Sequence, residues 1–246
     1  MMAEPAPFTF DTAFVLCLAF VLSFIPAAYG LGVSLLPAKP RRNRILFIWH
    51  AYDALTHLFV ESSFLYECFY SSVPVPTGLP PKPYFLGYQD RLHGAAYGSG
   101  PSARLWQEYA KADRRWAVSD PTIVSLELLT VLLEGPAAVY VCYLLYRSSN
   151  PRVSRYARAV SRSRLWFVAS AIAIAELYGG WMTFAPEWLT GSSQLETSNL
   201  VYLWLYLVFF NSLWVVFPVW VLWEATHEFR AAFVAAEVSA PVKKRT

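Results

Sequence analysis

The sequence is poor in charged residues. Asp, Glu, Lys and Arg make up 15% of its 246 residues, whereas hydrophobic residues make up 56%. A soluble domain carries roughly 25% charged residues, so this composition excludes an ordinary soluble domain and favours a membrane protein. The net charge of +3 is small, and the basic residues lie between apolar runs rather than on one face. A nucleic-acid partner is therefore not expected.

Several chemical motifs are also missing. The three cysteines lie in apolar stretches without CxxC spacing, which excludes a disulfide framework and a cysteine-based zinc site. The chain has no Gly-rich phosphate loop and no GxSxG nucleophile elbow. Nucleotide-dependent chemistry and serine-hydrolase chemistry have no support, and we expect no cofactor.

Five apolar runs are present, each long enough to span a bilayer as a helix of about 20 residues. They cover residues 14–36, 45–70, 122–146, 165–184 and 200–223. The prediction is an all-α bundle of five transmembrane helices with an intramembrane cavity. Residues 1–44 form the first membrane helix and a basic loop, residues 45–228 the four-helix portion, and residues 229–246 a polar cytosolic tail.

The long loop of residues 71–120 lies within the four-helix portion. Its first part has five prolines between positions 73 and 83, which predicts an extended segment. Residues 105–116 alternate apolar and polar side chains in the manner of a short amphipathic helix.

The charges of the loops set the topology. The loops after the first and third runs carry four and six basic residues and no acidic one, whereas the loop after the fourth run has no basic residue. The positive-inside rule then places the N-terminus outside the cytosol and the C-terminus inside it. The last four residues have lysines at 243 and 244, as in a dilysine retrieval signal. We expect a multi-pass protein of the endoplasmic reticulum membrane.

Polar side chains interrupt the second run at regular intervals. Asp53, His57 and Glu61 are spaced i, i+4 and i+8, which places them on one stripe of a helix. A charged side chain at the centre of a membrane helix costs about 3 kcal/mol on insertion scales. Such residues are expected to be functional or paired.

Two other runs offer polar stripes of their own. Glu127, Thr130 and Glu134 are spaced i, i+3 and i+7 on the third run, and Asn211 and Trp214 share a face of the fifth. Facing one another around a cavity buries these stripes at the lowest cost. Buried carboxyl groups can keep and donate a proton, and aromatic faces stabilise a cation. The combination predicts protonation of an alkene or epoxide, a carbocation and then deprotonation.

Structural alternatives remain for the same residues. Glu61 could be ion-paired to His57 as a structural link, and Asp53 could pair with Arg44. Asn211 could join helices by hydrogen bonds. A metal site at His57 and the carboxylates is the weakest interpretation, because His57 is the only imidazole assigned to it.

At these residues the sequence resembles the emopamil-binding protein family, the sterol 8,7-isomerases of the EXPERA superfamily. The similarity covers about residues 45–228 in order and spacing. It is carried by His57-Leu-Phe-Val-Glu61, by Leu105-Trp-Gln-Glu-Tyr-Ala-Lys-Ala-Asp113-Arg, by Glu127-Leu-Leu-Thr130 followed by Gly135-Pro136, and by Phe210-Asn211-Ser-Leu-Trp214.

This resemblance implies a membrane isomerase that moves a ring double bond from the 8(9) to the 7(8) position. By matched position, His57 and Glu61 would protonate the substrate or relay a proton, and Glu127, helped by Thr130, would accept one. Neither a metal nor a redox cofactor is implied. The residues expected to bind the substrate are Asp53, Glu134, Tyr178, Asn211 and Trp214.

The sequence also departs from the family pattern. Glu134 stands where Trp is usual, Glu176 and Gly180 replace Gln and Asp in the fourth run, and Asp53 is an additional acid. These changes favour, as the alternative, an isomerase or cyclase that acts on an epoxide or alkene in terpenoid or meroterpenoid biosynthesis. A non-catalytic sterol-binding protein is the second alternative. The expected partners are a hydrophobic small molecule and the lipid bilayer. The exact substrate and whether the chain forms a homodimer stay open.

Overall fold

Long helices dominate the computed structural model, which describes residues 8–78 and 84–239. The first helix, α1 (Thr12–Leu35), begins after Asp11, whose side chain accepts a hydrogen bond from Phe14 N. A continuous helical rod follows, built from α2 (Arg41–Leu55), the π-helix η1 (Thr56–Glu61) and α3 (Ser62–Tyr70).

The second half of the chain forms three more rods. The first consists of α5 (Pro121–Leu129), the π-helix η5 (Thr130–Glu134) and α6 (Gly135–Ser149). The second is α7 (Arg155–Leu189). The third consists of the π-helix η6 (Tyr202–Phe210) and α8 (Asn211–Ser239).

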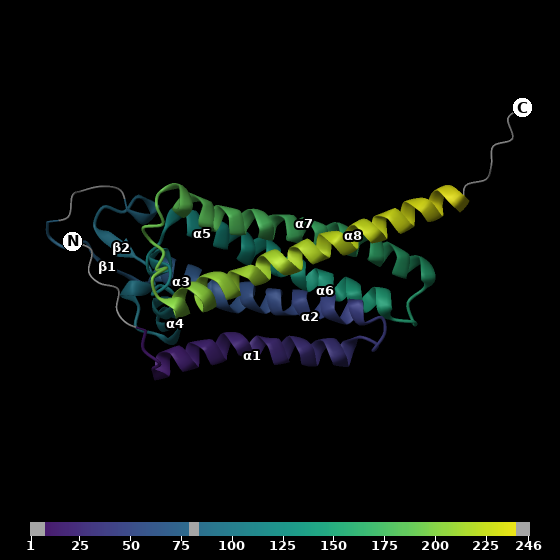
Figure 1. Cartoon of the computed structure of the whole chain (residues 1–246), viewed down its shortest axis with the longest axis horizontal. Helices are drawn as coiled ribbons and strands as arrows, with labels where there is room; N and C mark the ends of the chain where they lie inside the picture. The colour runs from purple at the N-terminus through teal and green to yellow at the C-terminus, as the bar shows by residue number, and fades with distance from the viewer. Residues whose placement is uncertain (1–7, 79–83, 240–246) are drawn as a thin grey trace, which may run out of the picture.

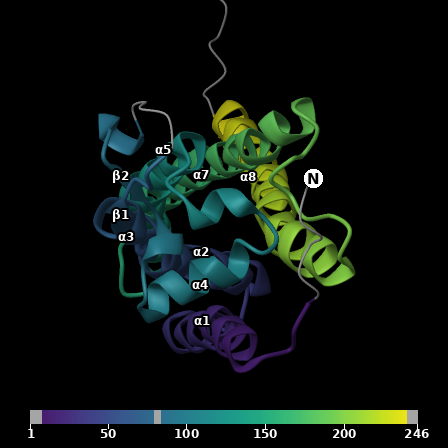
Figure 2. The ribbon, with the colours of Figure 1, turned by 90° about the vertical axis from the view of Figure 1, so that its left-hand side faces the viewer.

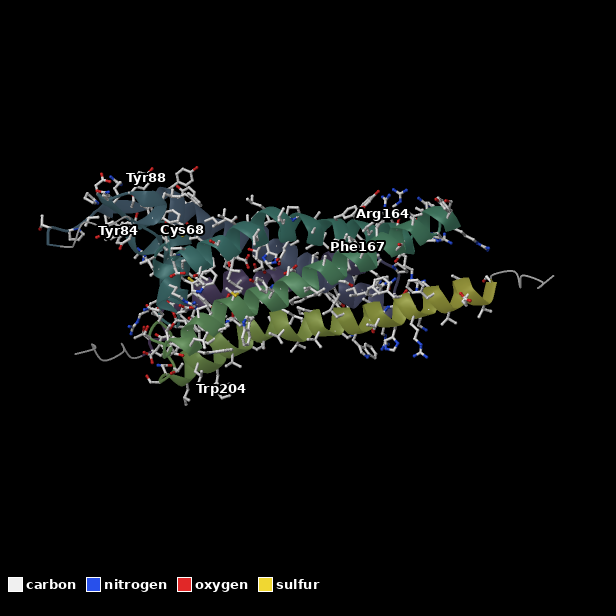
Figure 3. All side chains as sticks on the ribbon, turned by 90° about the horizontal axis from the view of Figure 1, so that it is seen from above. Cys68, Tyr84, Tyr88, Arg164, Phe167 and Trp204 are labelled. Carbon is white, nitrogen blue, oxygen red and sulfur yellow. The ribbon has the colours of Figure 1, made fainter. Side chains whose placement is uncertain are left out.

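Within the described residues, four helices are long and apolar enough to cross a membrane: Thr12–Leu35, Pro121–Ser149, Arg155–Leu189 and Tyr202–Ser239. The rod over residues 41–70 is also continuous, but the polar side chains in its middle lower its hydropathy. Large apolar side chains cover the outer surface, including Phe167 and Trp204, which are 73% and 60% exposed (Figure 3). An exposed apolar surface of this kind suits contact with lipid.

Successive rods run in opposite directions (Figure 1). The short basic connections around residues 36–40 and 150–154 lie at the same end of the bundle as the end of α8. The segment of residues 71–120 and the connection before η6 lie at the other end. This arrangement has the alternation that the loop charges predict.

The segment between the second and third rods is more ordered than the sequence suggests. It contains an antiparallel hairpin of β1 (Ser72–Pro74) and β2 (Arg91–His93), with Val73 opposite Leu92. Strands of three residues are too short for an alternating pattern to reveal them. The rest of the segment contains η2 (Phe85–Gly87), η3 (Ala95–Tyr97), α4 (Pro101–Tyr109) and η4 (Arg114–Ala117). Figure 2 shows α4 lying across this end of the bundle.

Ion pairs tie the rods together at the opposite end. Arg42 on α2 lies 3.1 Å from Glu224 and 2.7 Å from Glu228 on α8, and Arg162 on α7 lies 2.5 Å from Glu228. The guanidinium of Arg42 also lies over the ring of Trp166. The helix α8 continues through most of the predicted tail, to Ser239. The predicted retrieval signal at residues 243–246 lies outside the described residues.

Candidate active site

Each of the three π-helical stretches carries residues of the candidate site. His57 and Glu61 belong to η1, Thr130 and Glu134 to η5, and Tyr206 to η6. In a π-helix the backbone hydrogen bond spans five residues, as in the bond from Ser62 N to the carbonyl of His57. Such wider turns are frequent at functional sites. Here they arrange the polar stripes that the sequence placed on ordinary helices.

Gly135 allows two of these stretches to pack closely. A Cβ atom at this position would lie 3.0 Å from Leu58 Cδ2 and 3.2 Å from His57 Cβ. These distances are tighter than ordinary van der Waals contact. The absence of a side chain at Gly135 therefore lets η1 approach η5, and this brings Glu134 within 3.9 Å of the His57 ring.

His57 is the centre of the polar cluster. Its Nδ1 lies 2.5 Å from Glu61 Oε2, and its Nε2 lies 2.9 Å from Asp53 Oδ1. The Nε2 contact lacks good hydrogen-bond geometry, so a proton on this nitrogen is not directed at Asp53 Oδ1. The imidazole is 2% exposed. A buried imidazole with a carboxyl group against each nitrogen can hold a proton on either side.

Thr130 joins the two glutamates that the sequence assigns to acid–base chemistry. Its Oγ1 lies 2.7 Å from Glu61 Oε2 and 3.3 Å from Glu127 Oε2. The hydroxyl carries one hydrogen, so it can donate to only one of these carboxyl groups at a time. Glu61, Thr130 and Glu127 therefore form one connected set between the second and third rods.

The rod of η6 and α8, the fifth in chain order, holds Asp53 by a hydrogen bond. Trp214 on α8 donates its Nε1–H to Asp53 Oδ1 over 3.0 Å. The alternative pairing with Arg44 is wrong, because Arg44 donates instead to the carbonyl of Leu36 at 2.8 Å. Asp53 is fully buried and does not border the cavity. The expectation that it contacts the substrate is therefore corrected: its carboxylate lies against Nε2 of His57.

A cavity of about 660 Å³ opens beside the cluster, within the part of the chain that the structure describes. Most of its wall is apolar and comes from α1, α4, α7 and the η6–α8 rod. The sequence-predicted residues that line it are His57, Glu61, Glu127, Thr130, Glu134, Asn211 and Trp214. A pocket of this size and character suits a hydrophobic small molecule.

Asn211 lies at the junction of η6 and α8. Its amide donates to Tyr109 Oη at 3.1 Å and to the backbone carbonyls of Tyr206 and Leu207 at 3.0 and 2.9 Å. These contacts link α8 to α4 and to η6, as the hydrogen-bonding alternative for Asn211 expects. The residue also borders the cavity, so the two interpretations are compatible.

Tyr178, like Asp53, is a predicted residue that is not brought to the cavity. Tyr178 on α7 is 62% exposed and is not part of the lining, because its side chain lies on the outer surface of the helix. The matched stretch of sequence gave the correct helix but not the direction of this side chain.

Three polar residues were not assigned roles from the sequence. His50 on α2 is fully buried, and neither ring nitrogen has a hydrogen-bond partner among the described residues. Glu176 on α7 and Glu108 on α4 are buried and line the cavity. A titratable residue inside an apolar run was the available signal for His50 and Glu176, whereas Glu108 was hidden by the polar pattern of its short helix.

Sequence comparisons relate this chain to known proteins. Residues 101–225 match the family model EBP, described as EXPERA (EXPanded EBP superfamily). The 3-beta-hydroxysteroid-Delta(8),Delta(7)-isomerase of Cavia porcellus is 28% identical over 190 residues, which cover 77% of this chain and 67% of that protein. A probable enzyme of the same name from Oryza sativa subsp. japonica is 28% identical over 196 residues, covering 80% and 72%.

A relative named for a different activity is also similar. The isomeliandiol synthase of Melia azedarach is 24% identical over 216 residues, which cover 81% of this chain and 83% of that protein. The family model covers just over half of the chain and includes the Glu127–Thr130 pair and the Asn211–Trp214 face. The chain is therefore a membrane protein of the EXPERA family, the expanded EBP superfamily.

Proposed function

We propose that this protein is a membrane-embedded isomerase that moves a double bond in a steroid- or triterpenoid-type substrate, in the manner of 8(9) to 7(8) sterol isomerisation. The observation that carries the proposal is the contact chain from His57 through Glu61 and Thr130 to Glu127, at the wall of an apolar cavity. The names of the relatives from Cavia porcellus and Oryza sativa support the same reaction class.

In this mechanism the His57–Glu61 pair supplies a proton to one alkene carbon, which leaves a carbocation on the neighbouring carbon. The indole of Trp214, which borders the cavity, stabilises the positive charge. Glu127 then removes a proton from an adjacent carbon, and the electrons of that C–H bond form the new double bond. One proton enters and one leaves, so no cofactor is consumed.

The cellular setting belongs to the same proposal. The protein crosses the endoplasmic reticulum membrane five times, with the rod over residues 41–70 as the span that pure hydropathy leaves out. In the packed bundle Asp53 and His57 are almost completely buried, which lowers the cost of placing polar side chains in the bilayer. A hydrophobic substrate can reach the cavity from the lipid phase.

The test is to incubate membranes that contain the protein with an 8(9)-sterol in deuterated water. The expected result is a 7(8)-sterol that carries deuterium at C9, formed by the wild type and by Glu224→Gln, whose ion pair with Arg42 lies far from the cavity. Folded protein that gives neither product nor exchange would refute sterol isomerisation.

A second candidate function is the rearrangement of another terpenoid skeleton. The observation that favours it is the similarity to proteins named as synthases, the isomeliandiol synthase and the protoglabretal synthase of Citrus sinensis, the latter 25% identical over 183 residues. The same incubation with a mixture of cyclic and acyclic terpenoid alkenes separates the two candidates, because only the accepted skeleton gains deuterium.

A further inference from the structure

A second group of acids lies on the side of His57 that faces away from Glu61. Asp53, Glu134 and Glu176 come from three different rods, and none of them belongs to the Glu61–Thr130–Glu127 set. Oxygen or nitrogen atoms of Asp53, His57 and Glu176 lie within 4.8 Å of one another. Glu134 Oε2 lies 3.9 Å from His57 Nε2.

Several oxygens in this group have no hydrogen-bond partner in residues 8–78 and 84–239. They are Asp53 Oδ2, Glu134 Oε2 and both carboxyl oxygens of Glu176, a residue that is 5% exposed. A buried carboxylate without a donor is costly. One proton held between Asp53 and Glu176 would satisfy an acceptor on each, but Glu134 has no such neighbour.

The position of Glu134 and Glu176 bears on the ligand. Both residues contribute to the wall of the cavity, whose remaining wall is largely apolar. A protonated carboxyl group at an apolar cavity wall needs an acceptor, and a bound substrate can supply it. A site of this kind discriminates strongly between a ligand with the matching polar atom and an analogue without it.

The donor types of Asp53, His57 and Glu176 would also suit a divalent cation. A metal needs an imidazole nitrogen without a proton. His57 instead has Glu61 against one nitrogen and Asp53 against the other. This arrangement favours protons over a metal in this position.

We propose that Glu134 is a further catalytic acid that protonates an oxygen of the substrate, and that Glu176 and Asp53 support it by sharing a proton beside His57. The inference rests on the proposed function, since it uses the same cavity and the same proton acceptor. The substrate class is an apolar polycyclic or prenylated molecule that carries an epoxide.

The reaction conserves protons. Glu134 protonates the epoxide oxygen, a C–O bond breaks, and a hydroxyl group and a carbocation result. Glu127 removes a proton from the adjacent carbon, and the C–H electron pair forms a double bond. One proton has then left Glu134 and one has reached Glu127, so exchange of both carboxyl groups with water restores the starting state after the product leaves. The product is an allylic alcohol isomeric with the epoxide.

The experiment compares an 8(9)-sterol with its 8,9-epoxide in the purified full-length protein. With the epoxide, Glu134→Gln is expected to lower kcat by roughly 100-fold or more with KM almost unchanged, because the amide still donates a hydrogen bond but cannot transfer a proton. Glu134→Leu should also raise KM. The loss in Glu134→Gln should be at least about tenfold larger for the epoxide than for the alkene. Glu224→Gln serves as the matched control.

The outcomes separate this inference from the proposed function. Wild-type protein that isomerises the alkene but leaves the epoxide intact overturns the inference alone, as does an equal loss on both substrates in Glu134→Gln. Turnover of the epoxide without the alkene supports the inference and refutes sterol isomerisation. Infrared spectra give a readout independent of activity: Glu134→Gln and Glu176→Gln should each remove a protonated carboxylic acid band, and retention of all bands would contradict the assignment.

Discussion

Trp214 on α8 and Asp53 on α2 are joined by a hydrogen bond of 3.0 Å from the indole Nε1–H to the carboxylate Oδ1. The same oxygen lies 2.9 Å from His57 Nε2. The fifth rod therefore fixes the acid that lies against the imidazole, and the indole performs this task while its ring borders the cavity.

We expect Trp214→Phe to weaken this arrangement in two ways. Loss of the donor leaves a buried carboxylate oxygen with one contact fewer, which should lower the free energy of unfolding by about 1–3 kcal/mol. Turnover should fall by about tenfold or more, because the His57 ring is less firmly oriented and the cation loses an indole face. Thermal unfolding in detergent and product formation in membranes measure the two effects.

The matched control is Trp223→Phe, on the same helix but 57% exposed. It should change neither quantity appreciably. If the two variants behaved alike, the hydrogen bond to Asp53 would have no special role.

Glu61→Gln and Glu127→Gln should each reduce turnover by roughly 100-fold or more while the protein still inserts into the membrane. A glutamine keeps the size of the side chain and its contact with Thr130, but it cannot exchange a proton. Turnover of the accepted substrate per mole of inserted protein is the measurement. Near-normal activity in either variant would refute the acid–base assignment.

The long apolar runs predicted the rods, and polar residues inside them predicted most of the cluster. Spacing of four residues placed Asp53, His57 and Glu61 on one stripe, and the distances agree. Their exact partners were not readable, because contacts such as Asp53–Trp214 join positions 161 residues apart. Spacing alone assigns a helix face, but only the packed bundle decides which neighbour that face meets.

Other features had weak or misleading signals. The hairpin of β1 and β2 is too short to show a period, and the π-helical turns leave no pattern in residue types. Tyr178 failed as a cavity residue because the matched stretch fixes the helix but not its rotation. Glu176, two positions earlier, faces inward. In a helix, two positions correspond to about 200°, so opposite faces are expected.

The predicted topology can be tested by placing glycosylation acceptor sites in the connections between the rods. An acceptor in the arginine-rich segment of residues 147–164 should stay unmodified, because six basic residues hold this loop on the cytosolic side. An acceptor between residues 190 and 199 should be modified. Gel mobility before and after deglycosylation shows whether each of the two sites is modified. Modification of the site in residues 147–164 would contradict the proposed topology.

Gly180 on α7 borders the cavity, and an added Cβ at this position would have nothing within 4 Å. In Gly180→Ala the better helix propensity should raise the free energy of unfolding by up to about 1 kcal/mol. Gly180→Leu should keep this stability but extend into the cavity, so KM for a polycyclic substrate should rise by about tenfold while a small alkene is less affected. Gly135→Ala offers the opposite case, since its Cβ would press on Leu58 and His57. There we expect reduced stability and turnover for substrates of every size. If Gly180→Leu lowered activity equally for large and small substrates, the open space beside α7 would not be part of the substrate site.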